Sequence, residues 1–384
     1  MDFDLADEQS LFKDAIDKLV QKEYGFEQRR RYAAEPEGWS RRVWSQLAEQ
    51  GFLALPFDEA HGGLGYGPVE LMLVNEALGR GLLLEPYLST VVIAGGALRA
   101  GASDEQLALW VPQIAAGELL VSLAYLEKQS RYNLADVATR AELRDGEYRL
   151  SGTKIAVLHG DSADRLLVAA RTAGARTDEE GISLFMVDAD SAGLRRRGYR
   201  TQDGLRAADL ILSDVAVPAA NLVGRIGGGH ALLQRASDYA IAALASEAVG
   251  CMQAALEMSV DYLKQRQQFG APISRFQALQ HHAADMLVEV EQARSMAMLA
   301  ALVVDDVDEA ERRKTLSAVK VQIGKSGRIV GQLAVQLHGG IGVTEEYAVG
   351  HYFKRLTMIE SQFGDGEHHL TKIAAAGGFV SVTP

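Results

Sequence analysis

The sequence is almost without cysteine: its 384 residues include one, Cys251. A single cysteine excludes an intrachain disulfide, and it excludes a metal site built from several thiolates. Cys251 lies in an apolar run with helical spacing, where a small buried residue is the expected role. We therefore expect neither a disulfide framework nor a metal centre.

The chain also lacks an excess of basic residues. It has 39 Lys and Arg against 51 Asp and Glu, a formal net charge of -12. A nucleic acid demands a basic face on its partner, so we do not expect one to bind. A small phosphate-bearing molecule is not excluded, because it needs only a local positive site.

Long apolar stretches are missing as well. No run reaches the roughly 20 apolar residues that a membrane-spanning helix needs. The first residues, Met1 to Asp4, are acidic and do not have the basic-then-apolar form of a signal peptide. These features predict a cytoplasmic protein with no membrane partner.

Three regions with different hydrophobic periodicity predict an α+β chain of three domains. Residues 1–117 have helical spacing and predict an N-terminal all-α domain. Residues 118–225 contain short apolar runs bounded by Gly, Asp or Ser, which predict a middle β-barrel-like domain. Residues 226–384 predict a C-terminal four-helix bundle, with helices at 230–266, 276–304, 308–337, 347–359 and 367–376 and Asp308 as an N-cap.

Two segments of the C-terminal region carry groups suited to a phosphate-bearing ligand. In Tyr262–Ile273, Arg266 ends a predicted helix, and a guanidinium there can pair with a pyrophosphate through two parallel hydrogen bonds. In Gln336–Gly342, Gly339 and Gly340 allow a ligand to approach the backbone closely. Either segment alone could equally be a helix corner with a solvated arginine and a glycine turn. The two together favour a binding site.

In this order and at this separation, the two segments resemble the flavin signatures of the acyl-CoA dehydrogenase family, and the resemblance covers essentially the whole chain. It is closest to the small subunits of heteromeric enzymes such as pimeloyl-CoA dehydrogenase, and to steroid side-chain dehydrogenases. It implies FAD as cofactor, an acyl-CoA as substrate in fatty acid or steroid side-chain catabolism, and an electron-transfer flavoprotein as acceptor. In the family these elements hold the pyrophosphate and adenosine end of FAD across a subunit interface. The implied FAD contacts are Arg266, Gln268, Phe269, Gln277, Gln336, Gly339 and Gly340.

The sequence departs from the family at the catalytic base, the carboxylate that removes the α-proton of the acyl-CoA. The family usually supplies it as Glu in Tyr-Glu-Gly-Thr; in the matching stretch here, Gly364 occupies that position. Other members place the base as Glu-Arg before the first flavin segment, where this chain has Ala240 and Ile241. The catalytic residue is therefore unknown. Carboxylates that could act as a displaced base are Asp365, Glu247 and Glu367.

The middle region departs from the family too. A flavin-contacting stretch that resembles Thr-Glu-Pro followed by Gly-Ser reads Leu126–Arg131 here, without the glycine. The Trp-Ile-Thr that backs the isoalloxazine ring aligns with Ala156, Val157 and Leu158. We therefore expect this chain's own β domain to hold a flavin ring poorly.

These losses lead to one main hypothesis and two alternatives. The chain is predicted to be the base-lacking subunit of a heterotetramer with two copies of each subunit, in which a larger acyl-CoA dehydrogenase subunit supplies the base. One alternative is a self-sufficient homotetramer, or a related flavoenzyme, with a displaced base such as Asp365. The other is a non-enzymatic, flavin-free interaction protein on the same fold.

Two clusters of basic residues have simpler interpretations. Arg195–Arg197 could meet the phosphates of coenzyme A, but a solvated strand edge is favoured. Lys314, Lys320, Lys325 and Arg328 decorate a predicted helix whose other side is apolar, which predicts a solvent face.

Overall fold

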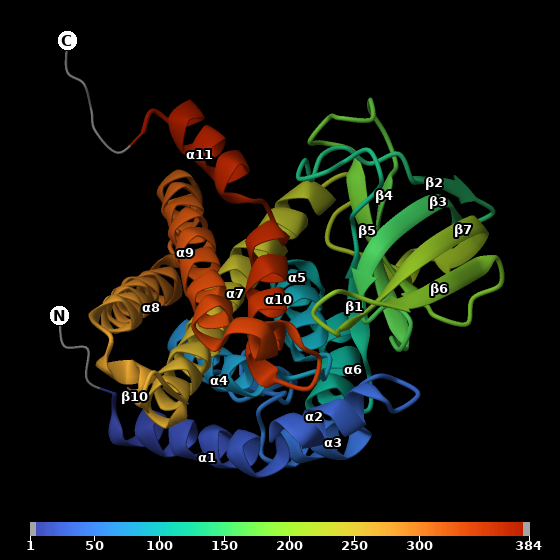
Figure 1. Cartoon of the computed structure of the whole chain (residues 1–384). Coiled ribbons are helices and arrows are strands. Elements are labelled where there is room, and N and C mark those ends of the chain that lie inside the picture. Colours follow the sequence, from blue (N-terminus) through green and yellow to red (C-terminus); the bar gives the residue numbers. More distant parts are fainter. Residues whose placement is uncertain (1–4, 379–384) are drawn as a thin grey trace. The chain divides into compact units, whose positions relative to one another are not determined.

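The computed structural model describes residues 5–378, so the acidic segment Met1 to Asp4 lies outside the described residues (Figure 1). The chain forms two compact units, each assembled from several segments. The first combines Met1–Arg31, Pro68–Leu83 and Ile241–Pro384, and the second combines Tyr32–Gly67 and Leu84–Ala240. Helices precede and follow a central run of strands, as predicted.

The first unit is helical within the described residues. Its C-terminal helices begin and end within two residues of the predicted bounds. Asp308 is an N-cap as predicted, because its side chain accepts hydrogen bonds from the backbone N–H groups of Ala310 and Glu311. The α-helices of this unit are α1 Asp7–Glu23, most of α2 Phe26–Ala33, α4 Pro68–Gly81, most of α7 Gly229–Gln265, α8 Gln277–Val303, α9 Glu309–His338, α10 Ala348–Ser361 and α11 Gly366–Ala375.

The second unit contains an eight-stranded sheet in the order β6-β7-β3-β2-β4-β5-β8, with β1 parallel to β4. Its apolar core includes Leu150, Leu166, Phe185 and Leu210, which are fully buried. The strands are β1 Val121–Ala124, β2 Arg140–Arg144, β3 Glu147–Leu158, β4 Arg165–Arg171, β5 Ile182–Asp188, β6 Leu194–Arg200, β7 Arg206–Pro218 and β8 Leu222–Val223. The helices that it contains, besides the start of α7, are α3 Arg41–Glu49, α5 Gly95–Gly101 and α6 Asp104–Ala115.

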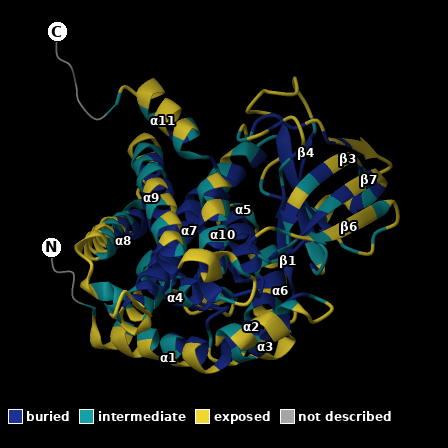
Figure 2. Ribbon diagram, viewed as in Figure 1, coloured by how far each residue is buried: buried dark blue, intermediate teal, exposed yellow. Residues whose placement is uncertain are grey.

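Strand β6 carries the basic run Arg195–Arg197. It pairs with β7 at the end of the strand order, and most of its residues are exposed (Figure 2). Arg196 donates to three backbone carbonyls and Arg197 pairs with Asp209 at 2.7 Å. The interpretation of this run as a solvated strand edge is thus confirmed.

Helix α7 passes the length and composition test for a membrane span, with a mean hydropathy of 1.3 over its most apolar window. The prediction concerned uninterrupted apolar runs, and α7 is interrupted by Arg235, Asp238 and Glu247, but it did not anticipate a helix that passes this test. However, 83% of that window is buried within the structure, and the core helix of a globular protein passes the same test. Burial of an all-round apolar helix explains its composition without a bilayer.

Helices α4 and α7 approach each other closely within the first unit because glycines face their contact. A Cβ atom on Gly250 would lie 1.9 Å from the carbonyl oxygen of Glu76, and one on Gly79 would lie 2.1 Å from that of Glu247. The adjacent Cys251 is fully buried, as predicted, and its Sγ donates to the Gly79 carbonyl at 3.2 Å. No other side chain fits at these two positions without separating the helices.

Lys320 on α9 contradicts the predicted solvent face, because it is 1% exposed. Its ammonium donates to the carbonyl oxygens of Ile359, Glu360 and Gly364 at 2.9, 2.8 and 2.8 Å. The first two carbonyls belong to the last turn of α10, where helix carbonyls have no helical partner and carry partial negative charge. Lys320 therefore fixes the end of α10 and the turn after it, and burial lowers the pKa of its ammonium to about 8.

Replacing Gly250 by Ala should lower the free energy of unfolding by about 1–3 kcal/mol, because the new methyl group collides with backbone. Gly327→Ala on α9 is the matched control, since its Cβ would meet Leu356 at an ordinary 3.4 Å. That control should be neutral or stabilise the protein by up to about 1 kcal/mol through helix propensity. Chemical denaturation of the two variants checks this, and equal effects would contradict the close helix approach.

The lowered pKa of Lys320 predicts that the free energy of unfolding increases as pH rises. The folded chain binds this proton less tightly than the unfolded chain, so the stability cost is present below about pH 8 and disappears as pH rises to 10.5. The wild type should therefore gain up to about 3 kcal/mol relative to Lys320→Met over that range. Denaturation of both proteins across this pH range measures the difference, and a constant difference would refute the assignment.

Candidate functional site

The two segments with groups for a phosphate-bearing ligand lie together in the first unit. Tyr262, one turn before Arg266 on α7, contacts His338 at the end of α9 with ring centroids 4.5 Å apart. His338 in turn contacts Tyr347 at 5.0 Å. Residues far apart in the sequence thus form one aromatic cluster between the two segments, and its packing sets where Arg266 and Gly339 begin their turns.

Arg266 follows the last residue of α7 and leads into a short hairpin, in which β9 (Gln267–Gln268) pairs with β10 (Ala271–Pro272). Phe269 at its tip is 89% exposed and makes an edge-to-face contact with Phe276 at 5.9 Å. An aromatic ring so exposed is unusual in an isolated chain. It leaves a flat apolar surface beside the arginine, open to a ligand or to another chain.

The polar side chains implied as FAD contacts are free to bind a ligand. Arg266, Gln268, Gln277 and Gln336 are exposed, and within residues 5–378 their side chains make no hydrogen bond or ion pair. Gln277 is the first residue of α8, and Gln336 lies in the last turn of α9. Donors and acceptors without internal partners are what a ligand site requires.

Gly339 and Gly340 keep the backbone accessible at the end of α9. Gly339 adopts a positive φ of 64°, and no atom lies within 4 Å of a Cβ placed on either glycine. The open space is therefore not filled by the chain itself. With Arg266 as the cation, the two segments offer a positive charge and an open backbone to a phosphate-bearing ligand.

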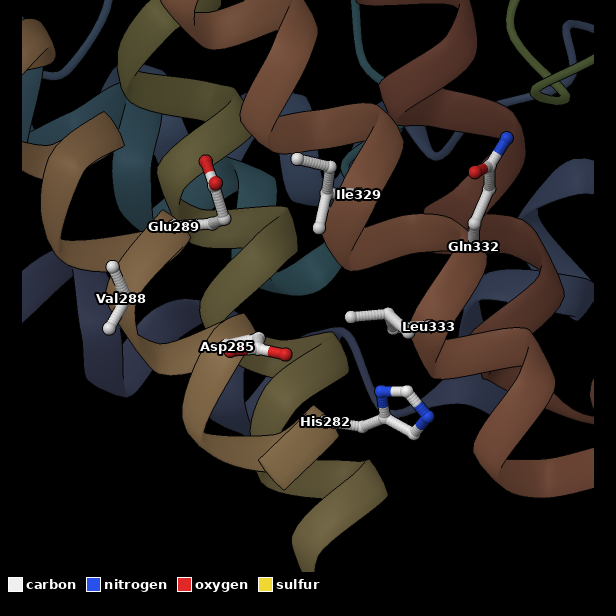
Figure 3. Close-up of a pocket in the computed structure, with 7 residues that line it drawn as sticks. All are labelled: His282, Asp285, Val288, Glu289, Ile329, Gln332 and Leu333. Carbon is white, nitrogen blue, oxygen red and sulfur yellow. The ribbon is translucent and has the colours of Figure 1, made fainter. Parts of the chain in front are cut away.

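A cavity of about 490 Å³ lies between α8 and α9 along the same helices (Figure 3). His282, Asp285 and Glu289 face it from α8, opposite Gln332 and Leu333 of α9. Its carboxylates disfavour a phosphate, so the anion-binding part of this surface is at Arg266. Among the described residues no group of three or more His, Cys, Asp or Glu is arranged to hold a metal ion.

Gly364, at the position of the family's base, has no room for a side chain. It is buried and has a φ of 109°, which a residue with a Cβ rarely adopts. A Cβ there would lie 2.6 Å from both His368 Cδ2 and His369 Nε2. His369 is fixed in turn, because its ring nitrogens bond to Ser317 Oγ and the Phe363 carbonyl.

Asp365 and Glu367, two of the possible displaced bases, have other roles. Asp365 is the N-cap of α11, and its carboxylate accepts a hydrogen bond from the His368 N–H at 2.9 Å. Glu367 is exposed in the first turn of α11, where a negative charge is favoured by the helix dipole. Both positions are explained by the stability of α11.

Glu247 forms a buried ion pair with Arg355 of α10. Its two carboxylate oxygens accept from Arg355 Nε and Nη2 at 2.6 and 2.7 Å. The two side chains are 11% and 4% exposed. A carboxylate held by a bidentate arginine is not free to take a substrate proton. Ala240 and Ile241, the other base position, are buried and apolar.

In the second unit, the loop aligned with the flavin-contacting stretch is occupied by internal bonds. Glu127 is 2.7 Å from the fully buried Lys154 and accepts from the backbone N–H groups of Ala138 and Thr139. Although burial opposes ionisation, the charge and hydrogen bond of Lys154 lower the pKa of Glu127 to about 2. Arg131, where the family has glycine, adopts a left-handed φ of 45°. Glu127 and Ser130 of this loop are buried, whereas Lys128, Gln129 and Arg131 are exposed.

The position aligned with the ring-backing tryptophan is a small exposed residue in an irregular strand. Ala156 lies in a bulge of β3, has a φ of 50°, and its N–H donates to Asp209 at 3.2 Å. Asp209 also holds Arg197 and Tyr199. A methyl group in place of an indole leaves little surface to stack on a flavin ring.

Sequence reasoning missed Arg355 as a functional neighbour and misjudged Lys320. Neither has a local signal, because their partners lie 108 and about 40 residues away along the chain. The one available hint for Lys320 is its spacing, since it lies four residues after Leu316, a buried residue of the apolar side of α9.

Comparison with known proteins identifies the family of the chain. Three family models match successive parts of the chain: the N-terminal domain of acyl-CoA dehydrogenases at residues 6–118, the middle domain at 122–215 and the C-terminal domain at 227–378.

Individual relatives cover most of the chain. A probable acyl-CoA dehydrogenase of Bacillus subtilis, YngJ, is 28% identical over 98% of this chain and 99% of its own. The acyl-CoA dehydrogenase FadE12 of Mycobacterium tuberculosis is 32% identical over 80% of each protein. Among solved structures, the ChsE4–ChsE5 complex from Mycobacterium tuberculosis matches with a TM-score of 0.86, 26% identity and full coverage of both chains. The chain therefore belongs to the acyl-CoA dehydrogenase family, whose members are FAD-dependent oxidoreductases.

Proposed function

We propose that this chain is the base-lacking subunit of a heteromeric acyl-CoA dehydrogenase, an enzyme that removes hydrogen from the α and β carbons of an acyl-CoA. The observation that carries the proposal is Gly364: it occupies the position of the base and is sealed by His368 and His369. A carboxylate cannot be accommodated there without moving both histidines. The proton must then be removed by a group on another chain.

The residues implied as FAD contacts support the same proposal, in which two different chains share one active site. Arg266 would hold the pyrophosphate of FAD, and Gln268, Gln277 and Gln336 would bind its polar edges beside Gly339 and Gly340. When bound, FAD accepts the hydride from the β-carbon of the substrate. These residues lie open on the surface of the first unit, as a half-site completed by a second chain requires.

The second unit supports the part of the proposal in which this chain does not bind the flavin ring. Its loop at Glu127 is saturated by Lys154 and backbone N–H groups, and Ala156 replaces the stacking tryptophan. A larger acyl-CoA dehydrogenase subunit would supply the ring site and the base. The ChsE4–ChsE5 complex, which has two different chains in its name, is a relative in keeping with such an assembly.

The acceptor and the location of the enzyme are parts of the proposal as well. We propose an electron-transfer flavoprotein as acceptor and a cytoplasmic enzyme. A chain in a solved structure described as the electron-transferring flavoprotein of Acidaminococcus fermentans matches this chain with 27% identity and a TM-score of 0.90. That likeness is in keeping with electron transfer between flavoproteins around this fold.

The chain purified alone should contain much less than one flavin per chain, because it has only the pyrophosphate half of the site. Flavin absorbance after purification under native conditions measures this directly. Once the chain is co-purified with its partner subunit, Arg266→Met should reduce bound FAD. Arg275→Met, an exposed arginine nearby without an ion pair in the described residues, is the control and should have no effect.

Two outcomes would contradict this. Flavin near one per chain in the isolated protein would favour the self-sufficient enzyme, and activity should then be lost in Asp365→Asn. Full FAD content in Arg266→Met, within a folded complex, would favour the flavin-free interaction protein.

If Glu247 is structural and not a displaced base, Glu247→Gln should lower the free energy of unfolding by about 3–5 kcal/mol, because Arg355 is left buried without a counter-charge. Glu257→Gln breaks the exposed Arg80–Glu257 pair, whose side chains are 39% and 48% exposed, and should cost less than about 1 kcal/mol. Thermal and chemical denaturation compare the two. An unchanged stability with abolished turnover in Glu247→Gln would instead assign the base to Glu247.

A further inference from the structure

Two arginines converge on a single tyrosine in the second unit. Arg99 of α5 and Arg235 near the start of α7 lie 4.8 and 4.6 Å from the ring centroid of Tyr239. Both guanidinium groups also donate to its hydroxyl oxygen, at 3.3 and 2.7 Å. Two like charges are thus held at one end of one ring, although like charges in proximity repel each other.

The convergence is fixed by close packing and does not depend on two flexible side chains. A Cβ on Gly96 of α5 would lie 2.7 Å from Tyr239 Cδ2, and one on Gly101 would lie 2.5 Å from Leu232 Cδ1. Both glycines therefore let α5 press against the first turns of α7. Tyr239 is 8% exposed, so its ring is held while the guanidinium groups at its hydroxyl end remain partly accessible.

The charge of the two arginines is only partly balanced. Arg235 Nη1 lies 3.5 Å from Asp238 Oδ2, and the Asp238 side chain is almost fully buried. Arg99 has no carboxylate within ion-pair distance among residues 5–378, and its bond to Tyr239 uses one of five N–H donors. The cluster of Arg99, Arg235, Asp238 and Tyr239 has a net positive charge, with donors left over on Arg99.

We propose that Arg99, Arg235 and Tyr239 form an oxyanion-binding site for the acyl-CoA ligand, with Arg99 as the residue that determines specificity. The inference rests on the proposed function in taking an acyl-CoA as the ligand. A planar guanidinium with free donors binds a carboxylate or a phosphate through parallel charge-assisted bonds. Tyr239 directly precedes Ala240, a position where relatives carry their base, so the site lies on a substrate-related turn of α7.

The oxyanion can come from two parts of such a ligand. An acyl chain that ends in a carboxylate would place it at the far end of the substrate, and coenzyme A itself carries phosphates. Both sources present the same chemistry to Arg99. They differ in whether the affinity depends on the acyl group or on the coenzyme.

Binding of matched probes to the purified full-length chain separates the two sources. Adipoyl-CoA and hexanoyl-CoA have the same acyl length and differ in a terminal carboxylate, and coenzyme A and its 3′-dephospho form differ in one phosphate. Isothermal titration with all four probes should show about a tenfold advantage for one member of one pair. Arg99→Met should abolish that advantage. Arg195→Met, which removes an exposed arginine of β6 in the same unit, should retain it.

The inference fails in either of two cases. No advantage within either pair in the wild type would overturn it, and so would Arg99→Met binding all four probes as the wild type does or weakening all four equally. An adipoyl-CoA advantage assigns the site to an acyl carboxylate, and a coenzyme A advantage assigns it to the 3′-phosphate. Failure of the proposed function is read separately, from the flavin content of the complex, which does not depend on Arg99.

Discussion

The buried ammonium of Lys320 determines the conformation of the segment on which the family's chemistry depends. By binding the last carbonyls of α10 and the carbonyl of Gly364, it joins α9 to the turn that leads into α11. Three carbonyl partners offset part of the desolvation of this charge, and the remainder is the stability cost that the lowered pKa of Lys320 reflects. The turn at Gly364 is therefore held from inside the protein, and its shape does not depend on a ligand.

Restoring a carboxylate at this turn would take more than replacing Gly364, because the surrounding residues would have to move as well. The backbone of Gly364 has a conformation that favours glycine, and the rings of His368 and His369 fill the space where a side chain would begin. His369 is locked by Ser317 and by the Phe363 carbonyl, and burial lowers the pKa of its imidazole to about 3, so the ring is neutral. The packed imidazole of His369 fills the space beside Gly364, and its low pKa makes it a poor base. The packing around Gly364 thus opposes a side chain at this position.

The sequence was sufficient for the order of the elements and for identifying two segments that the structure brings together. Long helices were predicted well because apolar residues recur over many turns and caps such as Asp308 mark their starts. Strands β2 and β8 were missed, whereas the run Arg195–Arg197 of β6 was interpreted correctly as a strand edge. Strand β8 has two residues, too few to show an alternation. The division into two units made of interleaved segments has no signature in the sequence.

Buried ionic groups were the main failure of sequence reasoning, and the reason is physical. Lys320, Lys154 and Arg355 each lie at positions where a charged residue ordinarily indicates solvent. What reverses that expectation is a partner that only the fold supplies: carbonyls of another helix, or the carboxylates of Glu127 and Glu247. Composition and periodicity describe one element at a time, so they cannot detect a pair formed between elements.

The distribution of satisfied and unsatisfied polar groups distinguishes structural sites from binding sites in this chain. Glu127, Glu247 and Lys320 are buried and have their hydrogen bonds fulfilled within the protein. Arg266, Gln277 and Gln336 are exposed and have no partner among the described side chains, although they lie around an ordered aromatic cluster of Tyr262, His338 and Tyr347. Water satisfies exposed donors, so these groups cost the fold little and remain available to a ligand. This contrast between satisfied buried groups and open exposed ones is what supports the proposed half-site at Arg266.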